Sequence, residues 1–298
     1  MLNNKTRSFS PGVHTALVTP FSGGRLDMNA LEKLLLIQRD SKVAGVVVLG
    51  TTGESPTVDA DERRRIITLA RRVLGGKKQL TVGCGSNDTK KAADAAKEAA
   101  ELGADLVMTV APYYNKPSQR GLLRHFLTVA DSSPVPVVIY NVPSRTGTDV
   151  TAQTLSVLSA HPNVAACKEA STDIASVTEK LLTVPLDFFC GSDTLLYHFL
   201  CLGAKGGVCV CSNVEPDVFC RITDTYFSGD HARSKEVFTV LLPFLQALSI
   251  DVNPVPVKTL MGAAGLISPE VRLPLCAMAE EKKTALLYAA AEAGIYIK

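Results

Sequence analysis

Eight short apolar runs, each bounded by Gly, Pro or Asn, alternate along the chain with segments of helical spacing. The first run is GVHTALVTP, from residue 12, and the last is KGGVCVC, which ends at residue 211. The runs are almost continuous in Val, Leu, Ile and Ala, which is typical of strands covered on both faces. Strands that alternate with helices in this way form a parallel sheet. No other feature of the sequence constrains the fold as strongly.

Eight regular strand–helix units predict an α/β fold, a closed (β/α)8 TIM barrel, over residues 1–212. An open doubly wound sheet is the alternative, but no G-x-G-x-x-G turn follows the first run, so closure is favoured. Residues 213–298 contain helical patterns only, with breaks at NVEP, FSGD and VNPVPVK. The sequence therefore predicts a barrel followed by a C-terminal helical region.

Charge and cysteine content narrow the class of partner and the compartment. Lys and Arg total 31 against 29 for Asp and Glu, so a small-molecule substrate is favoured over nucleic acid or a membrane surface. No apolar run reaches the about 18 residues that cross a bilayer, and the first residues lack a signal-peptide core. The eight cysteines contain no CxxC pair. We therefore expect a reducing, cytoplasmic setting without a zinc site.

Polar residues follow five of the apolar runs at their C-terminal ends. These segments are GTTGES (50–55), APYYN (111–115), IYNVPSRTG (139–147), CKEAS (167–171) and CGSD (190–193). In a (β/α)8 barrel the active site is built at this end of the strands. The segments are therefore expected to converge on one rim.

Lys168 ends the apolar run NVAACKE. Burial disfavours an ammonium group, so this setting suits an amine that must lose its proton before it attacks a carbonyl. A structural lysine paired with a carboxylate is the alternative. The neighbouring Cys167 is expected to point to the opposite face of the strand and to belong to the core.

The other rim segments offer an anion cradle, phenols and a guanidinium. GTTGES provides two hydroxyls and free backbone N–H groups, but its Glu54 stands where a P-loop has Lys. Tyr113, Tyr114 and Tyr140 can relay protons, and Arg145 can clamp a carboxylate. A plain turn, packing tyrosines and a loop-capping arginine are the alternatives for each segment taken alone.

Together these motifs resemble the dihydrodipicolinate synthase family, within the pyruvate-dependent class I aldolases. GTTGES, PYYNKPSQ, YNVPSRTG and KEAS stand in the family's order and spacing. The resemblance covers nearly the whole chain. It implies condensation of pyruvate with L-aspartate 4-semialdehyde to 4-hydroxy-tetrahydrodipicolinate, on the way to diaminopimelate and lysine, with no metal or organic cofactor.

The resemblance also assigns roles around the pyruvate. Lys168 would form the imine, and Thr51 and Thr52 would hold the pyruvate carboxylate. The proton relay would consist of Thr51, Tyr140 and Tyr114, with Tyr114 donated across a dimer interface.

Further implied positions concern the second substrate and the assembly. Arg145 would face the carboxylate of the aldehyde, and Gly191 and Val208 would line the pyruvate pocket. A homotetramer, as a dimer of dimers, is expected. N-acetylneuraminate lyase or another sugar-acid aldolase is the alternative enzyme, and a keto-acid-binding barrel without turnover is the alternative outside catalysis.

Feedback inhibition by lysine, common in the family, is expected to be weak or absent in this chain. Three positions of the family's lysine pocket are kept, namely Ser55, Asn87 and Tyr113. Three others differ, namely Ala60, Arg63 and Lys91. Lys91 replaces an acidic residue that pairs with the ligand's ammonium group, so attraction becomes repulsion.

Overall fold

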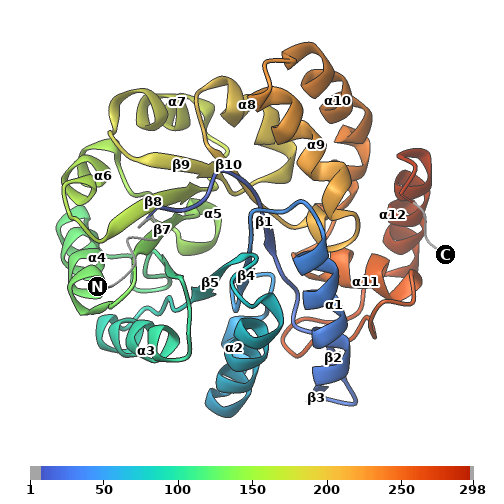
Figure 1. Cartoon of the computed structure of the whole chain (residues 1–298), viewed down its shortest axis with the longest axis horizontal. Helices are drawn as coiled ribbons and strands as arrows, with labels where there is room; N and C mark the ends of the chain where they lie inside the picture. Colours follow the sequence, from blue (N-terminus) through green and yellow to red (C-terminus); the bar gives the residue numbers. More distant parts are fainter. Residues whose placement is uncertain (1–7, 296–298) are drawn as a thin grey trace. The chain divides into compact units, whose positions relative to one another are not determined.

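Eight parallel strands form a closed barrel in the computed structural model, which describes residues 8–295 (Figure 1). The barrel strands are β1 (Gly12–Ala16), β4 (Gly45–Val48), β5 (Gln79–Gly83), β6 (Leu106–Val110), β7 (Val137–Asn141), β8 (Val164–Glu169), β9 (Asp187–Cys190) and β10 (Gly206–Cys209). Each lies within one of the eight predicted apolar runs. The predicted (β/α)8 barrel is confirmed.

Helices separate consecutive barrel strands. They are α1 (Met28–Asp40), α2 (Ala60–Leu74), α3 (Thr89–Glu101), α4 (Gln119–Ser132), α6 (Ala152–Ser159), α7 (Ile174–Thr183) and α8 (Leu196–Cys201). Most of them start at an Asp, Ser or Thr whose side chain accepts a hydrogen bond from the first turn. At α2 this is a full capping box, in which Asp59 and Glu62 each accept from the other's backbone N–H.

Several short elements carry no periodic signal in the sequence. They are the hairpin of β2 (Phe21–Ser22) and β3 (Arg25–Leu26), the helix α5 (Pro143–Thr146), and the 3-10 turns η1 (Ser55–Thr57), η2 (Asp193–Leu195) and η3 (Cys211–Asn213). After β10, the described part of the chain forms only η3 and the helices α9 (Pro216–Phe227), α10 (His231–Ala247), α11 (Val255–Ala263) and α12 (Glu280–Glu292).

The chain forms two compact units. Of the described residues, the first unit contains 8–11 together with Gln79–Val208, and the second contains Gly12–Lys78 together with 209–295. The boundary after residue 212 therefore stays a prediction. In the first unit, β5 to β9 pair side by side in parallel, and α3, α4, α6 and α7 lie outside these strands (Figure 1).

Both faces of the barrel strands are covered, as their composition predicts. All five residues of β7 and all four of β4 are buried. In β8 every residue except Ala165 is buried, Lys168 among them. A strand covered on both faces has no solvent side, so a charged group on it must meet a partner or a cavity.

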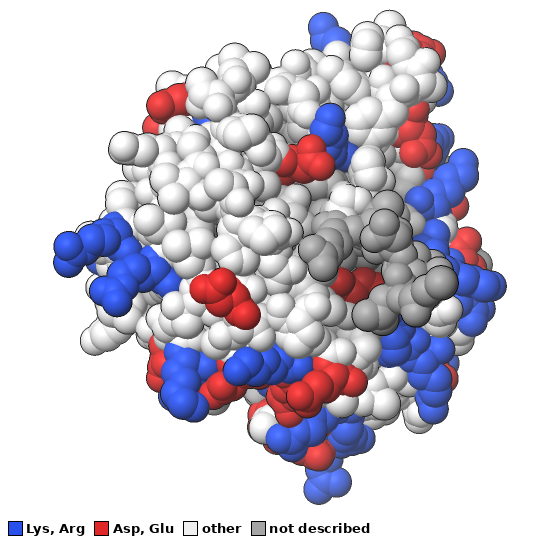
Figure 2. All heavy atoms as spheres, turned by 60° about the vertical axis from the view of Figure 1, so that its left-hand side comes forward, with Lys and Arg blue, Asp and Glu red and all other residues white. Residues whose placement is uncertain are grey.

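Charge on the molecular surface is mixed. Figure 2 shows Lys and Arg interspersed with Asp and Glu on one face, together with a broad region free of charged groups. Within residues 8–295 no helix is long and apolar enough to cross a membrane.

A buried histidine of α4, which contacts the first residue of α3, leads us to expect that acid destabilises the fold. His125 is 3% exposed, its Nδ1 pairs with Thr89 Oγ1 at 2.9 Å, and its Nε2 has no partner among the described residues. Burial lowers the pKa of His125 to about 4. The unfolded chain, in which an ordinary histidine pKa is about 6.5, therefore binds the proton more readily. Above pH 6.5 the histidine does not lower the free energy of unfolding. As the pH falls from 6.5 toward about 4, protonation of the unfolded chain lowers the free energy of unfolding by about 3 kcal/mol.

This expectation is checked by denaturant unfolding of the wild type and of His125→Asn, in which the amide can keep the contact to Thr89. The difference in unfolding free energy between pH 7 and pH 4.5 should be smaller in the variant, because it has no ring to protonate. Equal pH dependence in the two proteins would contradict the assignment.

Candidate active site

Lys168 is held against Tyr140 by the pairing of two neighbouring strands. β7 and β8 are in register with Tyr140 opposite Lys168 and Asn141 opposite Glu169. Lys168 is 6% exposed, and its Nζ lies 4.2 Å from the centre of the Tyr140 ring. The face of an aromatic ring carries negative charge density, which stabilises a cationic nitrogen placed over it. The same arrangement serves an ammonium group and a protonated imine.

Gly191 makes room for the Lys168 side chain. It follows β9, and its N–H donates to the Glu169 carbonyl at 2.8 Å. A Cβ at this position would lie 2.7 Å from Ala170 Cβ and 3.0 Å from Lys168 Cε. The first distance is shorter than real side-chain contacts allow. A larger residue would therefore collide with Ala170 and press on the Lys168 side chain.

Val208 lies on β10, whose residue Gly207 pairs with Cys190 of β9. Its side chain is buried, with 1% exposure. Val208 is thus on the strand next to β9, which Gly191 follows.

Arg145 lies on the segment that follows β7, in the four-residue helix α5. Residues 142–148, called here the Arg145 loop, are bonded internally. The N–H groups of Arg145 and Thr146 donate to the Val142 carbonyl at 2.9 and 3.1 Å, and Thr146 Oγ1 donates to the Thr148 carbonyl at 2.8 Å. Arg145 itself is exposed. Arg145 is therefore an exposed residue of a compact turn.

Tyr114 is directed into solvent from an unfavourable backbone conformation. Its φ is +71° and it is 90% exposed. A left-handed conformation is strained for a bulky residue and is held only by its surroundings. Here Asn115 donates its N–H to the Tyr113 carbonyl at 2.9 Å and its Nδ2 to the Asn87 carbonyl at 3.0 Å.

Thr51 and Thr52 belong to the second compact unit, in the tight turn after β4. The N–H groups of Gly53 and Glu54 donate back to the Gly50 and Thr51 carbonyls, each at 3.1 Å. Glu54 has φ +51°. A Cβ at Gly53 would lie 3.0 Å from the Leu49 nitrogen, so the turn has no room for a side chain there. Thr52 is 3% exposed, and its Oγ1 accepts from Asn253 Nδ2 at 3.0 Å.

Cys167 belongs to the core, as expected. It is fully buried, and burial, followed by the charge of Glu169, raises the pKa of its thiol well above the ordinary value. A reactive thiolate is therefore disfavoured at this position.

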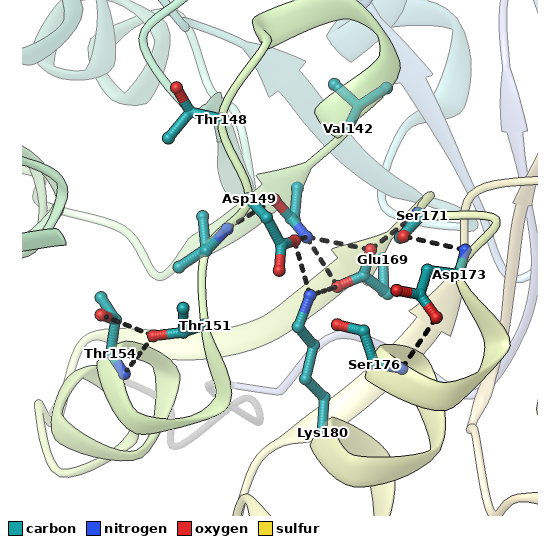
Figure 3. A network of polar contacts seen from close by, with 12 residues as sticks. Val142, Thr148, Asp149, Thr151, Thr154, Glu169, Ser171, Asp173, Ser176 and Lys180 are labelled. Atoms are coloured by element: carbon teal, nitrogen blue, oxygen red, sulfur yellow. Dashed lines mark hydrogen bonds and ion pairs between the residues drawn. The ribbon is translucent and has the colours of Figure 1, made fainter. Parts of the chain in front are cut away.

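Two buried lysines were missed by the sequence analysis. Lys180 reaches from α7 toward Asp149 and Glu169, as Figure 3 shows, with Nζ distances of 2.7 and 3.1 Å. Lys258, on α11, lies 2.6 Å from Glu54. Lys258 stands in the nearly all-apolar segment VPVKTLMGA, where a single charged residue is a signal for a buried pair. Lys180 gave no such signal, because its segment has ordinary amphipathic spacing.

Comparison with known proteins supports the resemblance. Residues 9–293 match the model of the dihydrodipicolinate synthetase family. The 4-hydroxy-tetrahydrodipicolinate synthase of Methanocaldococcus jannaschii is 38% identical over 276 residues, 92% of this chain and 96% of the relative. The Thermotoga maritima enzyme of the same name is 39% identical over 293 residues, 95% of this chain and 99% of the relative.

A solved structure agrees. The dihydrodipicolinate synthase of Thermotoga maritima superimposes with a TM-score of 0.94 at 37% identity, covering 96% of this chain and 99% of that chain. With the buried amine of Lys168 at the end of β8 in a closed barrel, these matches lead to one conclusion. The chain belongs to the dihydrodipicolinate synthetase family.

Proposed function

We propose that this protein condenses pyruvate with L-aspartate 4-semialdehyde to give 4-hydroxy-tetrahydrodipicolinate, in the biosynthesis of diaminopimelate and lysine. The observation that carries the proposal is the buried Lys168 amine over the Tyr140 ring, with Gly191 beside it, in a member of this family. The proposed reaction makes the protein a lyase that acts on carbon–carbon and carbon–oxygen bonds.

Lys168 is proposed as the nucleophile. Its neutral amine adds to the keto carbon of pyruvate, and the hydroxyl of the adduct takes up a proton and leaves as water to give a protonated imine. The Tyr140 ring face, 4.2 Å from Nζ, supports the positive charge of that imine. The imine nitrogen then accepts the electrons released when a methyl proton leaves, which produces the enamine.

Thr51 and Thr52 are proposed to hold the pyruvate carboxylate, and Thr51, Tyr140 and Tyr114 to move the proton. The proposal for the threonines is supported by their place in a tight turn with hydroxyls and backbone N–H groups. Gly191 and Val208 are proposed to line the pyruvate pocket.

Arg145 is proposed to bind the carboxylate of the aldehyde substrate. The enamine carbon attacks the aldehyde carbon, whose oxygen takes up a proton to become the hydroxyl of the product. The amino group of that substrate then attacks the imine carbon, and the bond from that carbon to Lys168 Nζ breaks. This last step closes the ring and returns Lys168 as the free amine.

Assembly as a homotetramer, a dimer of dimers, is part of the proposal. An exposed tyrosine at positive φ suits a side chain that completes the site of a second copy. A cytoplasmic location is also proposed, because the eight cysteines are present as thiols and six of them are buried.

The function is tested by supplying purified protein with pyruvate and either aspartate semialdehyde or N-acetylmannosamine. Product is followed by mass spectrometry. Condensation is expected with aspartate semialdehyde. Turnover of N-acetylmannosamine alone, or binding of pyruvate without turnover of either aldehyde, would overturn the proposal.

Arg145→Ala is expected to impair use of the aldehyde much more than imine formation. Loss of a charged bidentate contact should lower kcat/KM for aspartate semialdehyde by about 100-fold. Borohydride trapping of pyruvate on Lys168 should continue at the wild-type rate, because the imine pocket is untouched. Equal losses in both assays would show that Arg145 is structural.

L-lysine at millimolar concentration is expected to leave the rate nearly unchanged. Lys91 is exposed in the first turn of α3, and Ala60 is the exposed first residue of α2. An ammonium in place of a carboxylate repels a cationic ligand. The measurement is initial rate against lysine concentration, for the wild type and Lys91→Glu. The variant should stay insensitive because Ala60 and Arg63 also differ. Sub-millimolar inhibition of the wild type would contradict this.

A further inference from the structure

A buried polar cluster lies behind the strand ends that carry Tyr140 and Lys168. It has four members, namely Asn141 of β7, Asp149 directly after the Arg145 loop, Glu169 of β8 and Lys180 of α7. Figure 3 shows Lys180, Asp149 and Glu169 meeting at this point. The Lys180 and Glu169 side chains are 1% and 0% exposed, so neither can reach a substrate.

The cluster closes the base of the Arg145 loop. The loop leaves β7 at Asn141 and ends where Asp149 begins. The Asn141 side chain joins these two ends, because its Oδ1 accepts from the Val150 N–H at 3.0 Å and its Nδ2 donates to Asp149 Oδ1 at 2.7 Å. Internal hydrogen bonds make the loop compact, so a shift at its base moves Arg145 with it.

The same groups bind this base to the strand of the nucleophile. Asn141 Nδ2 lies 2.8 Å from Glu169 Oε2, and the Ser171 N–H donates to Glu169 Oε1 at 2.7 Å. Glu169 directly follows Lys168 on β8. Strand pairing already holds Tyr140 against Lys168, so what the contact between Asn141 and Glu169 fixes is the point from which the loop starts.

Among residues 8–295, Lys180 is the one cation bonded to both carboxylates of the cluster. Burial would lower the pKa of Lys180, but Glu169 and Asp149 outweigh burial and raise it. Removing this ammonium leaves two carboxylates facing each other with no countercharge, one of them fully buried. Asp149, whose side chain is 37% exposed, is the one free to turn toward water. The expected relaxation thus opens the base of the Arg145 loop.

We propose that this polar cluster is a positioning device that aims Arg145 at the carboxylate of the second substrate. The proposal rests on the proposed function, and it assigns Lys180 an indirect role through Asp149 rather than contact with reacting atoms. A cluster that only stabilised the barrel would affect both substrates alike. A cluster that positions the loop affects the aldehyde selectively.

The test uses Lys180→Met and Asp149→Ala. Both should lower kcat/KM for aspartate semialdehyde by about 100-fold, the order of loss that a misplaced binding group causes. Borohydride trapping of pyruvate on Lys168 should be nearly unchanged. Lys180→Arg, which keeps the charge, should recover part of the aldehyde activity. Asp149→Ala changes a half-exposed side chain, so it provides the answer if Lys180→Met does not fold.

Val177→Ala is the matched control. Val177 is fully buried on the same helix, α7, and no hydrogen bond of the cluster involves it. It should lower the unfolding temperature without changing the ratio of the two activities. Equal losses of imine trapping and aldehyde use in Lys180→Met and Asp149→Ala, or no loss in either, would overturn the proposal. A wild type that traps pyruvate but forms no product from aspartate semialdehyde would overturn the proposed function itself.

Discussion

Lys168→Ala is expected to abolish condensation, lowering kcat by about 10⁴-fold or more, as removal of an essential nucleophile does. Without the amine no imine forms, and pyruvate has no electron sink for loss of its methyl proton. In the wild type, pyruvate and borohydride should add the mass of one reduced imine to the peptide that contains Lys168. In the variant that adduct should be missing.

Cys167→Ala is the control for this experiment. Cys167 is the preceding residue of β8 and is also buried, and side chains alternate between the two faces of a strand. Its truncation tests whether any disturbance at this point of the strand stops the reaction, and activity should be retained. An adduct on a different lysine, or full activity of Lys168→Ala, would show that the nucleophile has been misassigned.

The barrel could be predicted from the sequence because its strands are buried on both faces. Strands buried on both faces need apolar residues at nearly every position, which gives continuous apolar runs such as VPVVIYN, bounded by turn residues. The two-residue strands β2 and β3 could not be predicted, because two residues show no period. Their place is determined by tertiary contacts, with Phe21 packed under the cations of Lys258 and Arg272.

For the candidate site, too, some residues could be proposed from the sequence and others could not. Lys168, at the end of β8, and Arg145, in the segment after β7, could be proposed from the sequence because a (β/α)8 barrel builds its active site at this end of the strands. Their roles stay a prediction. The supports behind them could not be proposed in this way. Lys180 comes from a helix of ordinary amphipathic pattern, and only the fold brings it to Glu169. The need for glycine at 191 likewise comes from the closeness of Ala170 Cβ and Lys168 Cε, which no local pattern records.

The second buried ion pair supports the other motif of the proposed site. Glu54, in the GTTGES turn, is bound by Lys258 Nζ at 2.6 Å and by the Arg272 N–H at 3.0 Å. Lys258 is completely buried and also donates to the Thr19 carbonyl at 2.9 Å. Burial lowers the pKa of Lys258, although Glu54 opposes this. Thr19 in turn donates its hydroxyl to the Gly53 carbonyl at 2.7 Å, so the pair and the turn form one bonded unit.

Lys258→Met is therefore expected to lower the free energy of unfolding by about 3–5 kcal/mol, because it leaves the buried Glu54 carboxylate without its countercharge. In the proposed function the loosened turn also binds pyruvate less well, so KM for pyruvate should rise. Denaturant unfolding measures the first effect and steady-state kinetics the second. This profile is the reverse of that expected for Lys180→Met, where the aldehyde is affected.

The coupling free energy between Lys258 and Glu54 shows whether the loss in Lys258→Met comes from breaking this ion pair or from general damage to the core. Adding Glu54→Gln to Lys258→Met removes the uncompensated charge and keeps an amide that can accept from the Arg272 N–H. The double variant should then be destabilised by clearly less than the sum of the two single variants. Strictly additive losses would mean that the two groups do not depend on each other. The short distance between them would then contribute nothing to the hold on the GTTGES turn.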